Sequence, residues 1–179
     1  MIGIGFAAYS GEPSREHLDK SKKFIEHLYR LTSFKNLSFL LGGYWGLMRY
    51  VVDWLREKKA LIILFPPLDM EELEYPKDVI VLRLGLSMRM RSIPLVRSSD
   101  IFIILGGESG SILELVTAYT EDKHVFMLVG SGHSTDKFVE MAPYIDNRRI
   151  TPIKIFRDPI SMAEEVYKAI KEIGGGESI

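Results

Sequence analysis

Two glycine-rich loops constrain this chain more than any other feature, because each follows an apolar run and opens a helical segment. The first is Gly42-Gly43-Tyr44-Trp45-Gly46-Leu47-Met48, and the second is Gly106-Gly107-Glu108-Ser109-Gly110-Ser111. A strand that ends in glycines and turns into a helix exposes backbone N–H groups at the positive end of the helix dipole. Such a loop binds phosphate or another anion without a lysine. Two of them in a chain of 179 residues predict a nucleotide-like ligand.

Apolar, β-rich runs alternate with amphipathic helical segments along the whole chain, which predicts a three-layer α/β/α domain with a mostly parallel sheet of about seven strands. The first strand is expected to be central, with the strands that carry the two glycine loops close to it. The expected strands are Ile2–Ala8, Leu37–Leu41, Leu61–Phe65, Val79–Leu82, Ile101–Leu105, Val125–Val129 and Ile153–Phe156.

The chain reads as a single domain over residues 1–173, since no linker or repeat divides it. A first helix is expected over Ser14–Leu31 from its apolar spacing. The last helix begins at Asp158, the expected N-cap, with Pro159 in its first turn. Glycines end that helix, and residues 174–179 are expected to form a mobile tail.

The composition narrows the classes of partner. A net charge of −1 predicts no binding of nucleic acid or of an anionic membrane surface. The longest apolar runs, such as Ala60–Phe65, are too short to cross a bilayer, and no basic segment precedes the first strand, so a cytoplasmic location is expected. Cysteine is absent and the histidines lack metal-ligand spacing, which predicts no metal. Absence of Gln and scarcity of Asn favour a heat-adapted source, a thermophile.

Ligands of open parallel sheets bind outside the carboxyl ends of the strands. Both glycine loops follow such ends, and so do Tyr9-Ser10-Gly11 and Gly130-Ser131-Gly132-His133. We therefore expect four loops to converge on one rim of the sheet.

Several residues on this rim allow a second interpretation. Ser111 and Glu114 have the spacing of a capping box, in which both would only satisfy N–H groups at the helix start. If Arg89 and Arg91 lie on a helix, they point about 200° apart and cannot form one cluster. Tyr44 and Trp45 either stack on a base or pack on the adjacent helix.

Three further residues carry expectations of their own. Pro94 should kink or shorten the helix that contains it. His17 and His27 are expected on the protein surface.

Taken together, the motifs resemble those of the Lonely Guy family and its wider superfamily of Rossmann-like nucleotide-binding proteins. The family pattern runs from a Gly-Gly loop into Gly46-Leu47-Met48, then to a methionine and an arginine, here within Met88-Arg89-Met90-Arg91. Ser99-Asp100-Ile101 matches its next strand, and Gly110-Ser111-Ile112-Leu113-Glu114 closes its second loop. The chain is most similar to an uncharacterised branch related to a molybdenum cofactor carrier protein.

The resemblance implies cleavage of the N-glycosidic bond of a nucleoside 5′-monophosphate, with Arg91 and Glu114 as the catalytic residues. It implies no cofactor and a homo-oligomer, a dimer or larger. The ligand-binding residues that it implies are Ser10, Gly42, Gly43, Gly46, Met88, Gly106, Gly107, Gly110 and Ser111.

Three residues depart from the family pattern: Arg49 replaces a glycine, Ser92 replaces a lysine, and Glu108 adds a carboxylate to the second loop. They favour the rival hypothesis, a carrier or sensor of a nucleotide or molybdopterin-type cofactor in which Arg91 and Glu114 only hold the ligand. The lead hypothesis remains a phosphoribohydrolase, a hydrolase of nucleoside monophosphates.

Overall fold

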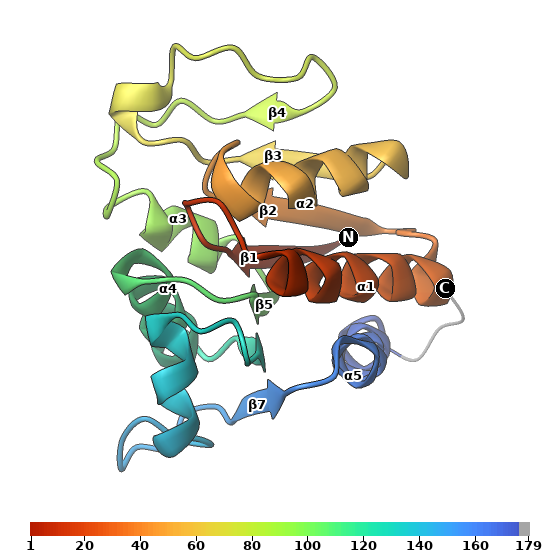
Figure 1. Ribbon diagram of the computed structural model, residues 1–179, viewed down its shortest axis with the longest axis vertical. Helices are drawn as coiled ribbons and strands as arrows, with labels where there is room; N and C mark the ends of the chain where they lie inside the picture. Colours follow the sequence, from red (N-terminus) through yellow and green to blue (C-terminus); the bar gives the residue numbers. More distant parts are fainter. Residues whose placement is uncertain (176–179) are drawn as a thin grey trace.

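A computed structural model describes residues 1–175 and contains one seven-stranded sheet in the order β4-β3-β2-β1-β5-β6-β7 (Figure 1). All six strand pairs are parallel. The strands are β1 (Ile2–Ala7), β2 (Leu37–Leu41), β3 (Leu61–Leu64), β4 (Ile80–Val81), β5 (Ile101–Ile104), β6 (His124–Leu128) and β7 (Ile153–Phe156). The expected α/β Rossmann-like fold is confirmed, and β1 lies between the two strands that carry the glycine loops.

Helices cover both faces of the sheet, which gives three layers (Figure 1). On one face lie α1 (Arg15–Thr32), α2 (Gly46–Glu57) and α5 (Pro159–Ile173); on the other lie α3 (Ser92–Arg97) and α4 (Ser109–Thr120). Short 3₁₀ turns, η1 (Leu68–Met70) and η2 (Ser134–Glu140), complete the elements.

Strand side chains alternate between the two cores. In β1, Ile4 and Phe6 pack with α1 and α2, whereas Ala7 faces the α3–α4 side. In β5, Ile103 belongs to the first core and Phe102 to the second. The apolar runs of the sequence are continuous because strands in such a sheet are buried on both faces.

The helix ends largely follow the sequence. Ser14 caps α1 by accepting a hydrogen bond from the N–H of His17, and Asp158 caps α5 by accepting one from the N–H of Ser161. The strands differ from expectation at their ends, most of all β4, which is two residues long rather than four. Of the expected mobile tail, residues 176–179 lie outside the described part of the chain.

The connection from β3 to α3 spans residues 65–91 and includes β4. Within this connection, the buried carboxylate of Glu71 accepts a 2.7 Å hydrogen bond from the N–H of Gly85. The Glu71 carbonyl also accepts one from Nε of Arg83. These contacts join residue 71 to residues 83 and 85 and so close the loop that contains β4. The chain then enters the turn at residues 88–91.

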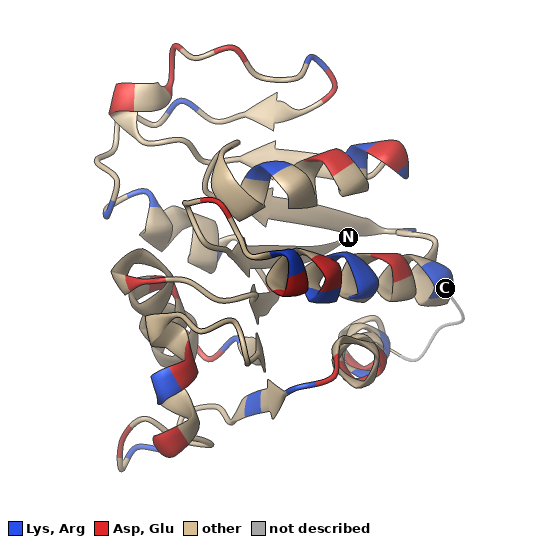
Figure 2. Cartoon of the chain, viewed as in Figure 1, with Lys and Arg blue, Asp and Glu red and all other residues tan. Residues whose placement is uncertain are grey.

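Acidic and basic side chains alternate along α1 (Figure 2), in keeping with the small net charge of the chain. Within residues 1–175, no helix is both long enough and apolar enough to cross a bilayer.

Candidate functional site

A cavity of about 440 Å³ lies at the carboxyl ends of the central strands. This volume is within the range of small-molecule pockets. Three of the four expected loops contribute to its wall, along with the turn before α3. The lining residues are Ser10, Trp45, Met48, Met88, Arg89, Arg91, Ser92, Glu108, Ser109, Gly110, Ser111, Leu113 and Glu114.

At one wall of this cavity, Arg91 and Glu114 form a buried ion pair. Nη1 of Arg91 donates to Oε1 of Glu114 at 2.8 Å, and the hydroxyl of Ser92 donates to the same oxygen at 2.9 Å. Arg91 is 7% exposed and Glu114 is 4% exposed. The structure therefore brings together the two residues that the sequence pairs as catalytic.

The capping-box interpretation of Ser111 and Glu114 is wrong. Helix α4 begins at Ser109 with Glu108 as its N-cap, so Ser111 already lies inside the first turn. Glu114 does not turn back to the helix start, because its carboxylate binds the side chains of Arg91 and Ser92.

The ion pair leaves polar atoms available. Burial raises the pKa of Glu114, while the charge of Arg91 and the hydrogen bonds from Ser92 and Arg91 oppose this rise. Both donors bind Oε1, so Oε2 has no hydrogen bond to residues 1–175. Nε of Arg91 is buried and also lacks a partner in the described chain. An unpaired buried donor beside a cavity is a feature that a ligand or water can satisfy.

Gly42 makes room for this arrangement. A β-carbon at Gly42 would lie 1.8 Å from Nη1 of Arg91, so the guanidinium occupies the space of the missing side chain. Gly42 therefore supports the site by seating Arg91 and does not line the cavity itself.

Arg89 and Arg91 do not diverge as a helix would require, because residues 88–91 form a turn and α3 begins only at Ser92. Both arginines line the cavity. Pro94 stands in the first turn of the six-residue α3, a position that tolerates the missing N–H, and the helix is short as expected.

The other glycines of the two loops allow close packing around the cavity. Gly46 has a φ of +52°, and a β-carbon there would lie 2.4 Å from the backbone of Ser10. A β-carbon at Gly106 would contact the side chains of Ser131 and His17, and one at Gly107 would contact the side chain of Ser111. Gly43 packs against the ring of Trp45.

Five of the predicted binding residues do not line the cavity: Gly42, Gly43, Gly46, Gly106 and Gly107. Ser10, Met88, Gly110 and Ser111 lie on it.

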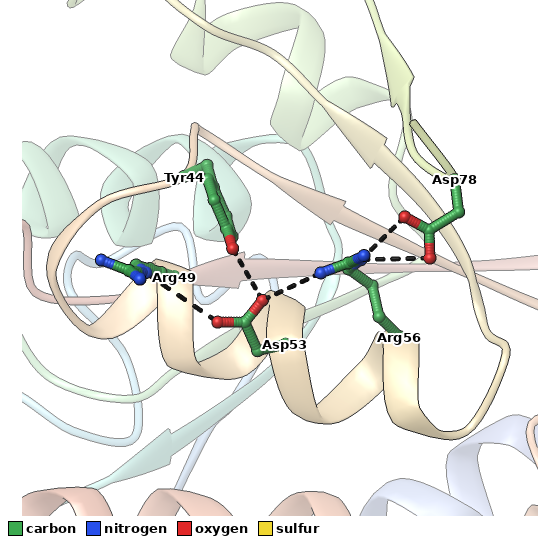
Figure 3. Close-up of polar contacts among 5 residues, drawn as sticks. All are labelled: Tyr44, Arg49, Asp53, Arg56 and Asp78. Atoms are coloured by element: carbon green, nitrogen blue, oxygen red, sulfur yellow. Dashed lines mark hydrogen bonds and ion pairs between the residues drawn. The ribbon is translucent and has the colours of Figure 1, made fainter. Parts of the chain in front are cut away.

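The first loop is tied to its helix by a chain of polar contacts (Figure 3). The hydroxyl of Tyr44 donates to Asp53 at 2.8 Å, Asp53 accepts from Arg56, and Nε of Arg56 donates to Asp78 at 2.8 Å. Arg49 lies beside Asp53 and over the Tyr44 ring, outside the cavity. Arg49 therefore does not obstruct the site. Of the two aromatic residues in the loop, only Trp45 lines the cavity.

The fourth loop closes over the second without lining the cavity. The ring of His133 stacks on Tyr9 with centroids 4.0 Å apart, and its Nδ1 lies 3.2 Å from Oε1 of Glu108. His17 is 2% exposed, contrary to the surface position expected for it, and its Nε2 bonds the carbonyl of Leu105. Burial lowers the pKa of His17. These contacts fix the loop behind the rim.

Seven residues that line the cavity lie outside the predicted set of site residues: Trp45, Met48, Arg89, Ser92, Glu108, Ser109 and Leu113. Leu113 is next to Glu114, and Met48 ends the first glycine loop. Their positions in the sequence could have indicated that they line the cavity. Within residues 1–175 no group of three or more His, Asp or Glu side chains could hold a metal ion.

A family model for the SLOG cluster4 family matches residues 8–154. The chain belongs to the SLOG cluster4 family. That match spans both glycine loops, the turn with Arg91, and Glu114, and it confirms the resemblance to the Lonely Guy-like superfamily. No curated protein matches this SLOG cluster4 chain by sequence.

Solved structures share the fold. TM1055, a structural-genomics target, is 26% identical with a TM-score of 0.79, over 94% of this chain and 99% of that one. The molybdenum cofactor carrier protein of Chlamydomonas reinhardtii is 18% identical with a TM-score of 0.72, over 94% and 98%.

DNA processing protein A of Helicobacter pylori, described with a single-stranded DNA binding mode, is 14% identical with a TM-score of 0.65, over 94% and 81%. The fold thus occurs in proteins with different ligands, and the cavity must carry the functional argument.

Proposed function

We propose that this SLOG cluster4 protein binds a nucleoside 5′-monophosphate and hydrolyses its N-glycosidic bond. The observation that carries the proposal is the buried Arg91–Glu114 pair on the wall of a 440 Å³ cavity, beside the N-terminus of α4. The N–H groups of Ser109, Gly110 and Ser111 are among the first of that helix, where a phosphate is stabilised by unpaired donors and the dipole. Trp45, Met48 and Met88 offer apolar surface for a base.

The chemistry follows from the free carboxylate oxygen. When the bond between C1′ and the base nitrogen breaks, its electron pair leaves with the base and positive charge develops on the ribose. Oε2 of Glu114, left unpaired by Arg91 and Ser92, stabilises that charge and takes a proton from the attacking water. The water oxygen bonds to C1′, and a proton reaches the base nitrogen. The products are the free base and ribose 5-phosphate.

Arg91 and Ser92 act by position. Both donate to Oε1, which fixes the carboxylate and opposes the rise in its pKa that burial causes. Ser92, although it replaces the family lysine, therefore has a role that fits the proposed reaction.

The test is base release from a panel of nucleoside monophosphates by the wild type and by Glu114→Gln. We expect Glu114→Gln to keep binding within about threefold and to lose about 10²-fold or more in base release, because only the transition state needs the carboxylate. Glu121→Gln, at the far end of the same helix, is the matched control and should behave as the wild type.

A second candidate is a carrier or sensor of a nucleotide or molybdopterin-type cofactor. It is favoured by the burial of Glu114 against two donors and by the structural likeness to the Chlamydomonas carrier protein. If the wild type binds nucleotide tightly and releases no base above background, the carrier function replaces the enzyme.

We further propose that the protein forms homo-oligomers through the surface of α3 and α4. Leu115, Ala118 and Tyr119 of α4 are fully buried, whereas Leu113 and Val116 remain partly exposed. Ile93 on α3 is 40% exposed. A second copy of the chain packed on this surface would cover these partly exposed apolar residues of the two neighbouring helices.

A further inference from the structure

The charged side chains that line the cavity differ in whether they have a polar partner within residues 1–175. Four charged side chains line it: Arg89, Arg91, Glu108 and Glu114. Arg91 and Glu114 neutralise each other at 2.8 Å. Glu108 is directed toward the fourth loop, where Nδ1 of His133 lies 3.2 Å from its carboxylate.

Arg89 differs from the other three. It is exposed on the turn at residues 88–91 and lines the cavity. Its guanidinium forms no hydrogen bond or ion pair within residues 1–175, and it does not pair with Glu108 across the same cavity. Arg89 is therefore the cation of this cavity that remains available to a ligand.

We infer that Arg89 is the residue that selects phosphorylated ligands, binding the phosphate monoester that the N-terminus of α4 also faces. This inference rests on the proposed function and assigns the recognition of phosphate charge to Arg89, whereas Arg91 is paired with Glu114. A guanidinium binds a phosphate dianion through two parallel N–H groups, which a single ammonium cannot reproduce. The N–H groups of a helix bind many kinds of anion and do not by themselves select a phosphate monoester. The unpaired guanidinium of Arg89 therefore supplies the preference for the charged ligand.

The walls of the cavity agree with this assignment. Arg89 comes from the same turn as Met88, while Ser109, Gly110 and Ser111 come from the start of α4. Trp45 and Leu113 add apolar surface to the same cavity. A nucleoside monophosphate has the same division, with one strongly charged end and one aromatic end.

The experiment compares phosphorylated and unphosphorylated ligands by isothermal titration calorimetry. The probes are AMP, GMP, CMP and UMP with their nucleosides, and ribose 5-phosphate with ribose, which tests the phosphate independently of the base. The wild type should bind the phosphorylated member of a pair at least tenfold more tightly.

Arg89→Gln should lose about tenfold or more in affinity for the phosphorylated member and leave the affinity for the nucleoside unchanged. Arg89→Lys should recover part of the loss, because charge returns without the paired donors. Arg30→Gln, an exposed arginine in the last turn of α1, is the matched control and should bind as the wild type.

The outcomes separate the two proposals. If the wild type binds none of the monophosphates, the proposed function fails and this inference fails with it. If the wild type prefers monophosphates and Arg89→Gln keeps the full preference while remaining folded, only the role of Arg89 is overturned. A wild type that binds nucleosides as tightly as monophosphates also overturns it.

Discussion

The guanidinium of Arg91 occupies the space beside Gly42 in which a side chain would otherwise lie, with Nη1 1.8 Å from the position of a β-carbon. The contact joins the first glycine loop to the turn before α3. A glycine that looks like a phosphate-binding residue in the sequence thus serves a different purpose: it holds a catalytic candidate in place.

Gly42→Ala should therefore displace Arg91 and weaken the fold. Adding a methyl group to a filled space costs about 1–3 kcal/mol of unfolding free energy. Urea denaturation measures this loss, and base release should fall with it because Arg91 no longer holds Glu114. Gly110→Ala is the control for the urea measurement alone, since a β-carbon at Gly110 meets no atom within 4 Å. Equal stability of Gly42→Ala and the wild type would contradict the seating role.

Gly110→Val should abolish ligand binding and leave the protein folded. Gly110 lies in the first turn of α4 and lines the cavity, so a branched side chain there projects into free space. The obstruction falls where an anion must approach the helix N–H groups. Calorimetric titration with AMP measures binding, and circular dichroism measures folding. Undiminished AMP binding by Gly110→Val would place the ligand elsewhere.

The buried His17 should make the protein less stable in acid. The pKa of His17 is lowered by burial, so the unfolded chain takes up a proton near pH 6.5 that the folded chain resists. Stability is thus complete above pH 6.5 and falls as the pH drops below it, by up to about 1.4 kcal/mol per pH unit.

Urea titrations at pH 7.5 and 5.5 should show a smaller loss for His17→Gln than for the wild type. Arg30→Gln, on the same helix, should retain the full loss because arginine does not titrate between these pH values. An identical acid dependence in the wild type and His17→Gln would assign the effect to other groups.

The contact between His133 and Glu108 should set how strongly Glu108 opposes an anion. Glu108→Gln removes a negative charge at the start of α4 and should tighten AMP binding by about two- to fivefold. His133→Ala frees the carboxylate and should weaken binding. The double variant should bind as well as Glu108→Gln, because the released side chain no longer carries charge. Additive effects in this cycle would show that the two residues act independently.

The wild type should elute and scatter light as a dimer or larger assembly at micromolar concentration. Ile93→Lys places a charge on the exposed apolar surface of α3 and should shift the protein toward monomer without loss of thermal stability. A monomeric wild type under these conditions removes the proposed interface.

The sheet could be predicted because its determinants are local. Continuous apolar runs such as those of β1 and β5 are typical of strands buried on both faces, and glycines follow β2 and β5 where the chain turns into a helix. The length of β4 could not be predicted, because a two-residue strand at the edge depends on pairing with β3.

The details of the site depend on long-range packing and were less accessible. The spacing of Ser111 and Glu114 is the same whether the helix has its N-cap at residue 108 or at residue 111, so the capping box and the ion pair look alike in sequence. His17 resembles other polar residues of α1 until the fourth loop packs over it. Arg89 and Arg91 share a wall only because residues 88–91 turn before α3 begins.

The pairing of β1 with β5 has a consequence for how the site comes into being. Gly3 hydrogen-bonds to Asp100, 97 positions later, and β1 reaches its final neighbours only after β5 has been made. Contacts of such separation close late in folding, because the loop entropy must be overcome first. The loop after β1, which carries Ser10, and the start of α4, which carries Ser111, therefore meet late, and the proposed nucleotide would bind only the finished cavity. Ligand present during refolding should stabilise the folded protein and leave the rates of the early folding steps unchanged.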